Sequence, residues 1–443
     1  MITDTNVKEI LLSIINSGIN AVKPEILMKE KIEYFDEVLL INNESFDLSN
    51  VDKVYVVGFG KVSAAMALEL EKILGDRITK GLVITNNTDH SKLKTITARI
   101  GNHPILDAKV LEASEEIISI CNDAKENDLV ICLISGGGSA LFEKLPQDIS
   151  LMDLQTLTKL LLNCGASIDE INKVRKCFSL VKNGRLLSFI KPAKSINLII
   201  SDVVGDHIGS IASSPTYIDR TSFKKAYSIL QSNNLFEKLP KSICEFLFDG
   251  LRKESQEEVI VNSPVTGVNN FIIGSNTEAL MAMETSAKRY QLNTTILTSK
   301  FQGEAREVAK VFGGIIKNIA ERNHPISKPA CIIAGGETTV TVRGQGLGGR
   351  NQELTLATLI SLEDSKAKYG FASCGTDGID GATQAAGGIV DYKMWDDIRE
   401  NNIIPNEFLN QNDSFHFLKI VDGLIFSPPG QTNVMDLMVG IIY

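Results

Sequence analysis

Short runs of Val, Ile and Leu alternate with amphipathic segments along the first half of the chain. Strands are predicted where these apolar runs lie, at 51–60, 81–87, 128–135 and 196–203. Helical spacing is found between them, at 62–74 and 110–124. Continuous apolar strands separated by helices are typical of a parallel sheet that is covered on both faces. The pattern therefore predicts an N-terminal Rossmann-like α/β domain with a doubly wound parallel sheet.

The same alternation returns in the second half. Strands are expected in 269–276, 294–299, 330–342, 369–378, 421–427 and 436–443, and helices in 277–290, 303–320 and 351–362. The run TTVTV at 338–342 is β-branched, which favours a hairpin or the edge of a mixed sheet. Between residues 235 and 267 the pattern weakens into Pro, Gly and charged residues. We therefore expect two α/β domains, 1–250 and 251–443, the second with a mixed sheet.

Composition narrows the class of protein. The 443 residues are 43% hydrophobic and 22% charged, as in a globular protein. A net charge of −9 argues against nucleic acid as a partner, because that contact needs a basic face. No run approaches the ~18 apolar residues of a membrane span, and the N-terminus lacks the pattern of a signal peptide. Small-molecule substrates are the expected partners, and homo-oligomer formation stays open.

The seven cysteines are scattered and odd in number, without CxxC or Cys/His spacing. Cys132 and Cys331 lie inside apolar runs. Reduced, packed thiols are the reading that fits this pattern, since disulfide frameworks use paired cysteines in an oxidising compartment. We therefore expect a cytoplasmic protein.

Two glycine-containing loops follow predicted strands of the first half. Gly58-Phe59-Gly60-Lys61 combines a sharp turn with a lysine at a helix start, which suits a phosphate oxygen. A plain glycine turn with a solvated lysine explains it equally well. Ser135-Gly136-Gly137-Gly138-Ser139 is more specific, because three successive glycines suit a cradle of backbone amides with hydroxyl donors beside it. The alternative is a tight crossing from strand to helix.

Acidic residues follow the next predicted strand. Asp202 and Asp206 stand four apart beside Gly205, and oxygen ligands of this kind can hold Mg²⁺. They can equally cap a turn or the following helix. His207 is adjacent, and a lone histidine is more often a packing or surface residue.

The second half carries a dense loop region. Gly335-Gly336-Glu337-Thr338-Thr339 precedes a glycine-rich run that ends in Arg350 and Asn351, and we expect Glu337 and Asn351 to bind substrate or phosphate. Arginine opposes the preference for acids at a helix start, so we expect Arg350 to recognise phosphate or carboxylate, or to stabilise a transferring phosphoryl group. Asp377 and Asp380 lie in another strand-end loop, for which an Asp-Gly turn is the ordinary explanation.

Taken together, eleven segments resemble, in order and along nearly the whole chain, the glycerate 2-kinase family whose C-terminal half is called the MOFRL domain. The segments are VVGFGKVSAAMA, GNHPILD, LISGGGSALFEKLP, INKVRKCFSLVKNGRL, ISDVVGDHIGSIASSPT, IIGSN, GEAREVAKV, AGGETTVTVRGQGLGGRNQE, GTDGIDG, NDSFHF and GQTNVMDL. The resemblance implies transfer of a phosphoryl group from ATP, with Mg²⁺, to the 2-hydroxyl of D-glycerate, in a cleft between two domains. Lys61 and Arg350 match the family's catalytic lysine and arginine.

The resemblance also implies a set of binding roles. The SGGGS loop, residues 135–139, matches the phosphate-binding segment of the family. Glu337, Asp377 or Asp202 is expected to orient Mg²⁺ or to take the hydroxyl proton. Arg175 is a further candidate cation, although a solvated helix face explains it too.

The chain departs from the family in several places. Val204 stands where proline is common, and His207 where a second acid is frequent. Ser213 to Thr216 read SSPT in place of Ser-Gly-Pro-Thr, and 427–432 vary a glycine-rich run. These changes leave Lys61, the SGGGS loop and Arg350 in place, and bear instead on the metal role of the 202–207 loop.

Two other functions compete with the kinase. An NAD(P)-dependent hydroxypyruvate reductase is disfavoured, because no nicotinamide fingerprint with its acidic ribose partner is evident. A phosphosugar-binding regulator also uses Ser/Gly-rich loops at strand ends. Such a regulator would have little reason to carry the GGRNQE and TDGIDG segments.

Overall fold

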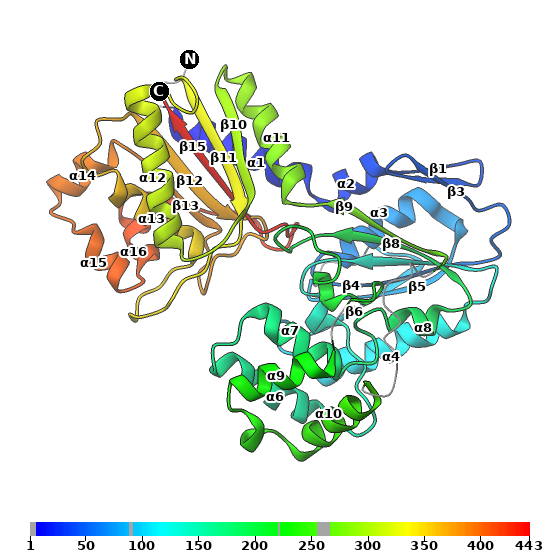
Figure 1. Ribbon diagram of the computed structural model, residues 1–443. Helices are drawn as coiled ribbons and strands as arrows, with labels where there is room; N and C mark the ends of the chain where they lie inside the picture. The colour runs from blue at the N-terminus through cyan, green and yellow to red at the C-terminus, as the bar shows by residue number, and fades with distance from the viewer. Residues whose placement is uncertain (1–5, 88–91, 220–221, 255–265) are drawn as a thin grey trace. The chain divides into compact units, whose positions relative to one another are not determined.

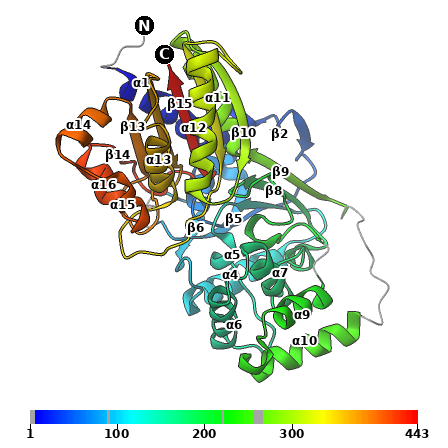
Figure 2. The same cartoon turned by 60° about the vertical axis from the view of Figure 1, so that its left-hand side comes forward.

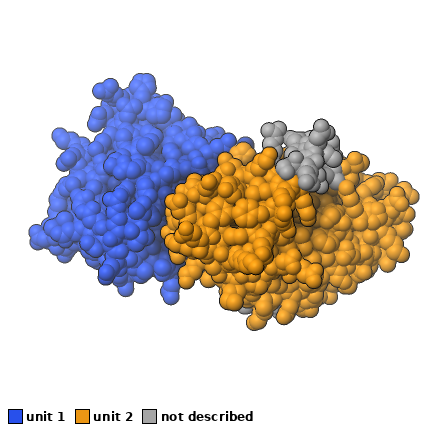
Figure 3. Space-filling view, turned by 60° about the horizontal axis from the view of Figure 1, so that its bottom comes forward, with its two compact units in different colours: residues 1–27, 202–205, 274–443 blue, residues 28–201, 206–273 orange. Residues whose placement is uncertain are grey.

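The computed structural model describes residues 6–87, 92–219, 222–254 and 266–443. Contacts divide the chain into two units, coloured separately in Figure 3. Unit 1 consists of Met1–Leu27, Asp202–Gly205 and Gly274–Tyr443, and unit 2 of Met28–Ser201 and Asp206–Ile273. This division differs from the predicted linear split into 1–250 and 251–443. The predicted boundary falls inside helix α10, Lys241–Glu254.

Unit 2 is built around the parallel sheet that the apolar runs predict. Its elements are α2(Pro24–Lys31), β1(Ile32–Phe35), β2(Val38–Ile41), β3(Glu44–Asp47), β4(Val54–Phe59), α3(Ser63–Leu74), η1(Gly75–Arg77), β5(Ile78–Thr85), β6(Ile96–Ile100), α4(Ala108–Asp123), β7(Leu129–Ile134), α5(Gly138–Leu141), α6(Leu151–Asn163), α7(Ile168–Cys177), α8(Leu186–Ile190), β8(Lys194–Ile200), η2(Ile211–Ser213), α9(Phe223–Ser232), η3(Phe236–Lys238), α10(Lys241–Glu254) and β9(Val268–Gly274).

The six strands of this sheet lie in the order β6-β5-β4-β7-β8-β9. In chain order these are the third, second, first, fourth, fifth and sixth strands, which is the Rossmann order. The pairs from β6 through to β8 are parallel. Figure 1 draws α3 on one face of the sheet and α4 and α8 on the other. The predicted doubly wound sheet is therefore confirmed.

Two parts of unit 2 were not predicted. Strands β1, β2 and β3 form a separate antiparallel sheet. Helices α6, α7, α9 and α10 pack on one another, with aromatic side chains between them, and form the group at the bottom of Figure 1. Strand β9 completes the parallel sheet beside β8, because the Ser195 amide donates to the Gly267 carbonyl at 2.8 Å. This pairing places residues 268–273 in unit 2.

Unit 1 contains the mixed sheet. Its elements are α1(Val7–Ala21), α11(Asn276–Arg289), β10(Asn293–Phe301), α12(Ala305–Arg322), β11(Ala330–Gly336), α13(Arg350–Ser361), β12(Tyr369–Gly375), β13(Gly387–Asp391), α14(Met394–Glu400), α15(Pro405–Asn410), α16(Ser414–Ile420), β14(Leu424–Ile425) and β15(Asp436–Ile442). The strand order is β10-β11-β15-β12-β13-β14, and only the pair β10-β11 is parallel. The predicted C-terminal strand therefore lies inside the sheet.

Helices cover both faces of the mixed sheet. Figures 1 and 2 show α12 and α13 on one face and α1 with α11 on the other. Helix α1 joins unit 1 because its apolar residues, among them Leu11 and Ile14, are fully buried there. Among the described residues, no single helix is long and apolar enough to cross a membrane; α1 and α2 pass that test only as a pair bent by 56°.

The predicted strand 330–342 is too long. Strand β11 ends at Gly336, and TTVTV makes only one isolated bridge, between Glu304 and Thr339. The reason lies at Gly336, whose φ of 144° turns the chain away from the sheet. A Cβ there would meet the Phe301 carbonyl oxygen at 2.2 Å, so only glycine fits. The β-branched run is therefore loop, and the expectation of a hairpin is wrong.

Candidate functional site

The two glycine loops of unit 2 lie at the switch point of its sheet. Strand β4 is flanked by β5 on one side and by β7 on the other. In sheets of this order, ligands bind outside the carboxyl ends of the two strands where the winding reverses. Residues 60–62 follow β4, and residues 135–138 follow β7. Sequence position alone therefore brings both loops to the expected binding crevice.

Backbone hydrogen bonds hold these two loops together. The Lys61 amide donates to the Gly136 carbonyl at 2.8 Å, and the Val62 amide donates to Ser135 Oγ at 3.2 Å. Gly60 has a φ of 130°, and a Cβ there would lie 2.2 Å from Ser135 Oγ. The glycine is therefore required by the close approach of the second loop, not by a turn alone.

Two basic side chains lie close to Gly137 of the loop. Its φ is 80°, and a Cβ there would lie 3.0 Å from His103 Nε2 and 3.1 Å from Lys61 Cγ. Lys61 and the triple-glycine loop are thus adjacent, as the site prediction requires. His103 was not singled out from the sequence, although it lies in GNHPILD. Only the folded chain shows its proximity to Gly137.

The segment after β8 also packs on the SGGGS loop. Ser139 Oγ lies 2.7 Å from Ser213 Oγ. Ala212, Ser213 and Ser214 all have positive φ angles, of 48°, 60° and 63°. Side chains in this left-handed region cost about 1–2 kcal/mol per residue. Such strain is commonly kept at functional sites.

Arg175 lies beneath this loop. Its Nη2 group donates to the Ser139 carbonyl at 3.1 Å. Burial lowers the pKa of Arg175, and the carboxylate of Glu143 opposes that shift. The Arg175 side chain therefore contacts the backbone of the predicted phosphate-binding segment. A direct contact with substrate stays a prediction.

In unit 1, Arg350 is fixed by a buried carboxylate. Its Nε donates to Asp436 Oδ2 at 2.6 Å and its Nη2 to Asp436 Oδ1 at 2.9 Å, while Glu337 lies 3.4 Å from Nη2. Burial disfavours the guanidinium charge, but the carboxylates of Asp436, Glu337 and Asp380 outweigh this effect and raise the pKa of Arg350. Among the described residues, no hydrogen-bond acceptor contacts Nη1, which leaves it for a ligand.

The first turn of α13 supports this geometry. Asp380 accepts the amides of Asn351 and Gln352, at 3.1 and 2.9 Å. Burial raises the pKa of Asp380, and the two amides oppose the rise. Asn351 itself is fully buried and donates to Asp436 Oδ1 at 3.0 Å. It was predicted to bind substrate, and the contacts described here are with protein groups.

Carboxylates gather around Glu337. Burial raises its pKa, and the neighbouring Arg350 guanidinium opposes this only in part. Three further carboxylates raise it: Asp436, Asp202 and Asp377. Crowded carboxylates favour a cation, and Mg²⁺ needs few protein ligands because it keeps several waters. Within the described ranges, no three His, Cys, Asp or Glu residues form a metal-binding group.

Of the two predicted metal ligands, Asp202 belongs to unit 1 with Glu337, whereas Asp206 belongs to unit 2. Asp202 and Asp377 both raise the pKa of Glu337, so these acids of unit 1 act on one another electrostatically. A metal role for Asp202 and Asp206 together stays a prediction.

The loop that leads to Arg350 is held by the segment 411–413. The Gly346 amide donates to the Gln411 carbonyl at 2.8 Å, and the Leu347 amide to Asp413 Oδ1 at 2.9 Å. Asn412 Oδ1 accepts the amides of residues 343 and 344. Sequence reasoning gave NDSFHF no role. The structure shows that its first two residues shape the approach to α13.

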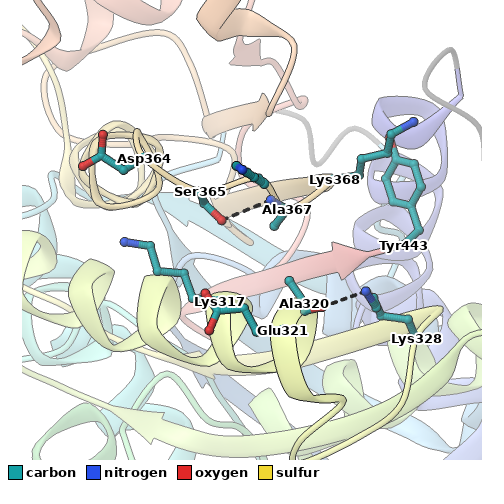
Figure 4. A pocket seen from close by; sticks show the side chains of 10 residues that line it. Lys317, Ala320, Glu321, Lys328, Asp364, Ser365, Ala367, Lys368 and Tyr443 are labelled. Carbon is teal, nitrogen blue, oxygen red and sulfur yellow. Dashed lines mark hydrogen bonds between the residues drawn. The ribbon is translucent and has the colours of Figure 1, made fainter.

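A pocket of about 520 Å³ lies at the opposite end of the mixed sheet (Figure 4). Its lining includes Lys317, Lys328, Lys366 and Lys368. These residues lie near the starts of β11 and β12, whereas Glu337 follows the end of β11. The Lys328 ammonium already donates to the Ala320 carbonyl at 2.7 Å. This pocket is separate from the cluster around Arg350.

Comparison with known proteins identifies the family. Residues 10–248 match a family described as "Domain of unknown function (DUF4147)", and residues 330–436 match the MOFRL family. A protein from Pyrococcus horikoshii named glycerate 2-kinase is 40% identical over 99% of this chain and 98% of its own length. The chain belongs to the glycerate 2-kinase family. This confirms the resemblance drawn from the eleven sequence segments.

A solved structure and a differently named relative also resemble this member of the glycerate 2-kinase family. The crystal structure of a glycerate kinase from Thermotoga maritima superposes with a TM-score of 0.85, at 34% identity, over 99% of this chain and all of that one. A relative from Agrobacterium vitis, 36% identical over 86% of this chain and 97% of its own length, is named as a presumed hydroxypyruvate reductase. The predicted two-domain α/β fold is thus confirmed.

Proposed function

We propose that the protein is a glycerate 2-kinase, which transfers the γ-phosphoryl group of ATP to the 2-hydroxyl of D-glycerate. The hydroxyl oxygen forms the new bond to phosphorus, the bond from phosphorus to the β,γ-bridging oxygen breaks, and ADP and 2-phosphoglycerate leave. The observation that carries this proposal is the pairing of the Lys61 loop with the triple-glycine loop at the sheet's switch point. A relative named glycerate 2-kinase, aligned over nearly its full length, supports it.

Phosphoryl transfer requires mainly positioning and neutralisation of charge. The amides and hydroxyls of 135–139 and the Lys61 ammonium hold phosphoryl oxygens. Arg350 presents Nη1 to the transferring group or to the glycerate carboxylate, while Asp436 keeps the guanidinium plane fixed. This division of roles follows from which guanidinium nitrogens the protein already engages.

The acids around Glu337 take the remaining roles. Two of the acids Glu337, Asp377 and Asp202 would hold Mg²⁺, which neutralises phosphate charge when bound. One of them accepts the proton of the 2-hydroxyl. Glu337 suits proton transfer best of the three, because burial raises its pKa and so favours its taking up a proton. Cytoplasmic location remains part of the proposal, supported by seven cysteines that are all free of disulfides.

An assay of ADP release tests this function against the reductase. The protein is given ATP and Mg²⁺ with D-glycerate, L-glycerate, lactate or hydroxypyruvate in turn, and NADH with hydroxypyruvate in a separate reaction. The proposal predicts ADP release that depends on D-glycerate, with no loss of NADH absorbance. NADH oxidation without ADP release would instead establish the reductase.

A further inference from the structure

A lysine and a glutamate are buried together directly behind the triple-glycine loop. The side chains of Lys182 and Glu143 are 1% and 0% exposed, and Lys182 Nζ lies 2.9 Å from Glu143 Oε2. Burying two charges is expensive, and apolar residues of similar size often stabilise a fold as well or better. Stability alone is therefore a weak reason for this pair, and its position in the fold suggests another.

Lys182 acts on the backbone that continues the loop. Its ammonium donates to the Phe142 carbonyl at 2.8 Å. Phe142 directly follows the four-residue helix α5, which begins at Gly138 within the SGGGS loop. The Phe142 amide also donates to the Gly138 carbonyl at 3.1 Å. Any shift of Phe142 is thus passed directly to the third glycine.

Arg175 also binds a backbone carbonyl, one helical turn earlier in the chain. It donates to the Ser139 carbonyl, and its Nε is buried without a hydrogen-bond partner among the described residues. Carbonyls at the end of a helix lack partners inside it, so external donors must satisfy them. Arg175 here satisfies the Ser139 carbonyl of α5, and Lys182 satisfies the carbonyl of Phe142 directly after it. Glu143 raises the pKa of both cations against the effect of burial.

We propose that Lys182 and Glu143 are positioning residues for phosphoryl transfer, which fix the triple-glycine loop through the Phe142 carbonyl. Glu143 holds the ammonium in place, and the ammonium holds the backbone. Two cations against one carboxylate also leave excess positive charge behind the loop, which favours an anion in front of it. This inference rests on the proposed function of the loop as the phosphate cradle.

The test compares three variants in the full-length protein. Lys182→Met removes the ammonium, and Lys182→Met with Glu143→Gln removes both charges. Lys144→Met is the control, because Lys144 is the next residue after Glu143 but pairs with Glu115 on the surface. For each variant we measure the urea unfolding midpoint, the affinity for the non-hydrolysable analogue AMP-PNP by calorimetry, and kcat and KM for glycerate phosphorylation.

The double variant separates positioning from stability. Removing both charges leaves no buried unpaired ion, so we expect its unfolding midpoint to return toward that of the wild type. A misplaced cradle should still lower kcat by about 10²-fold and weaken AMP-PNP binding. Lys144→Met should stay within about twofold of the wild type, since exposed ion pairs contribute little. A double variant that regains both stability and turnover overturns the proposal.

Failure of the proposed kinase function can be distinguished from failure of the positioning role. If the wild type released no ADP with glycerate, the affinity for AMP-PNP would carry the test alone. Weaker binding in the double variant at a wild-type unfolding midpoint would support the positioning role. Unchanged binding in that variant would refute it.

Discussion

Arg350 and Asp436 form a two-point ion pair at the junction of α13 and β15, with N···O distances of 2.6 and 2.9 Å. They are 86 residues apart in sequence. The Asp436 side chain is fully buried, whereas that of Arg350 is 29% exposed. The carboxylate therefore serves as an internal anchor, and the guanidinium keeps one free edge for a ligand.

Replacing Arg350 should abolish most of the activity. Arg350→Ala removes the cation that we assign to the transferring phosphoryl group, and such a cation contributes ~10³-fold or more. Steady-state kcat should fall by about that factor, with the fold retained by circular dichroism. Arg322→Ala, at the exposed end of α12, is the matched control and should leave kcat unchanged. Near-normal turnover in Arg350→Ala would rule out the assigned role.

Asp436→Asn tests whether Asp436 holds Arg350 in position without itself taking part in phosphoryl transfer. The amide keeps one acceptor oxygen but loses the charge, so the guanidinium is held less firmly. We expect a loss of about 2 kcal/mol in the free energy of unfolding, as for a bond between charged groups. We also expect kcat to fall by about tenfold or more, which is less than in Arg350→Ala. Urea denaturation and initial rates measure both, and an unchanged kcat would contradict the anchoring role.

Lys61→Ala should weaken the handling of phosphate in unit 2. Lys61 lies beside Gly137 of the triple-glycine loop, and loss of its charge should lower kcat/KM for ATP by about 10²-fold or more. Lys72→Ala, on the surface of α3, provides the control, because the Lys72 side chain is 59% exposed and its ion pair with Glu69 contributes little. If the two variants had equal kcat/KM, Lys61 would have no part in catalysis.

Two glycine substitutions should change stability in opposite directions. Gly137→Ala places a side chain at φ 80° within 3.1 Å of His103 and Lys61, so we expect a loss of about 1–2 kcal/mol and of activity. Gly314→Ala, inside α12, meets nothing within 4 Å and should gain about 0.5–1 kcal/mol. Chemical denaturation measures both. Equal stability changes would contradict the backbone argument.

Much of the fold could be predicted because its strands are continuous apolar runs. Strands β4, β5, β7 and β8 are almost entirely buried, and burial on both faces leaves a plain signal in sequence. Strands β1 to β3 were missed, since they are four residues long and partly exposed. The prediction that TTVTV belongs to a strand is wrong for a different reason. Its residues favour a strand, but the backbone conformation at Gly336 ends the strand before them.

The site was only half visible in the sequence. Glycine loops and an arginine at a helix start are local signals, and they led to Lys61, the SGGGS loop and Arg350. Asp436 was not singled out, because it opens the apolar strand DLMVGII and its partner lies far away in sequence. A charged residue at the head of a fully buried strand was the available clue. Lys182 and Glu143 were not predicted either, because they are far apart in sequence and meet only in the folded chain.

Glycerate 2-kinase activity is tested most directly by following the phosphorus atom itself. The wild-type protein is incubated with ATP, Mg²⁺ and D-glycerate, and ³¹P NMR identifies the phosphorylated product. A 2-phosphoglycerate resonance should grow in equal amount with ADP as ATP is consumed. A product phosphorylated at the 3-hydroxyl, or ADP formed with inorganic phosphate alone, would contradict it.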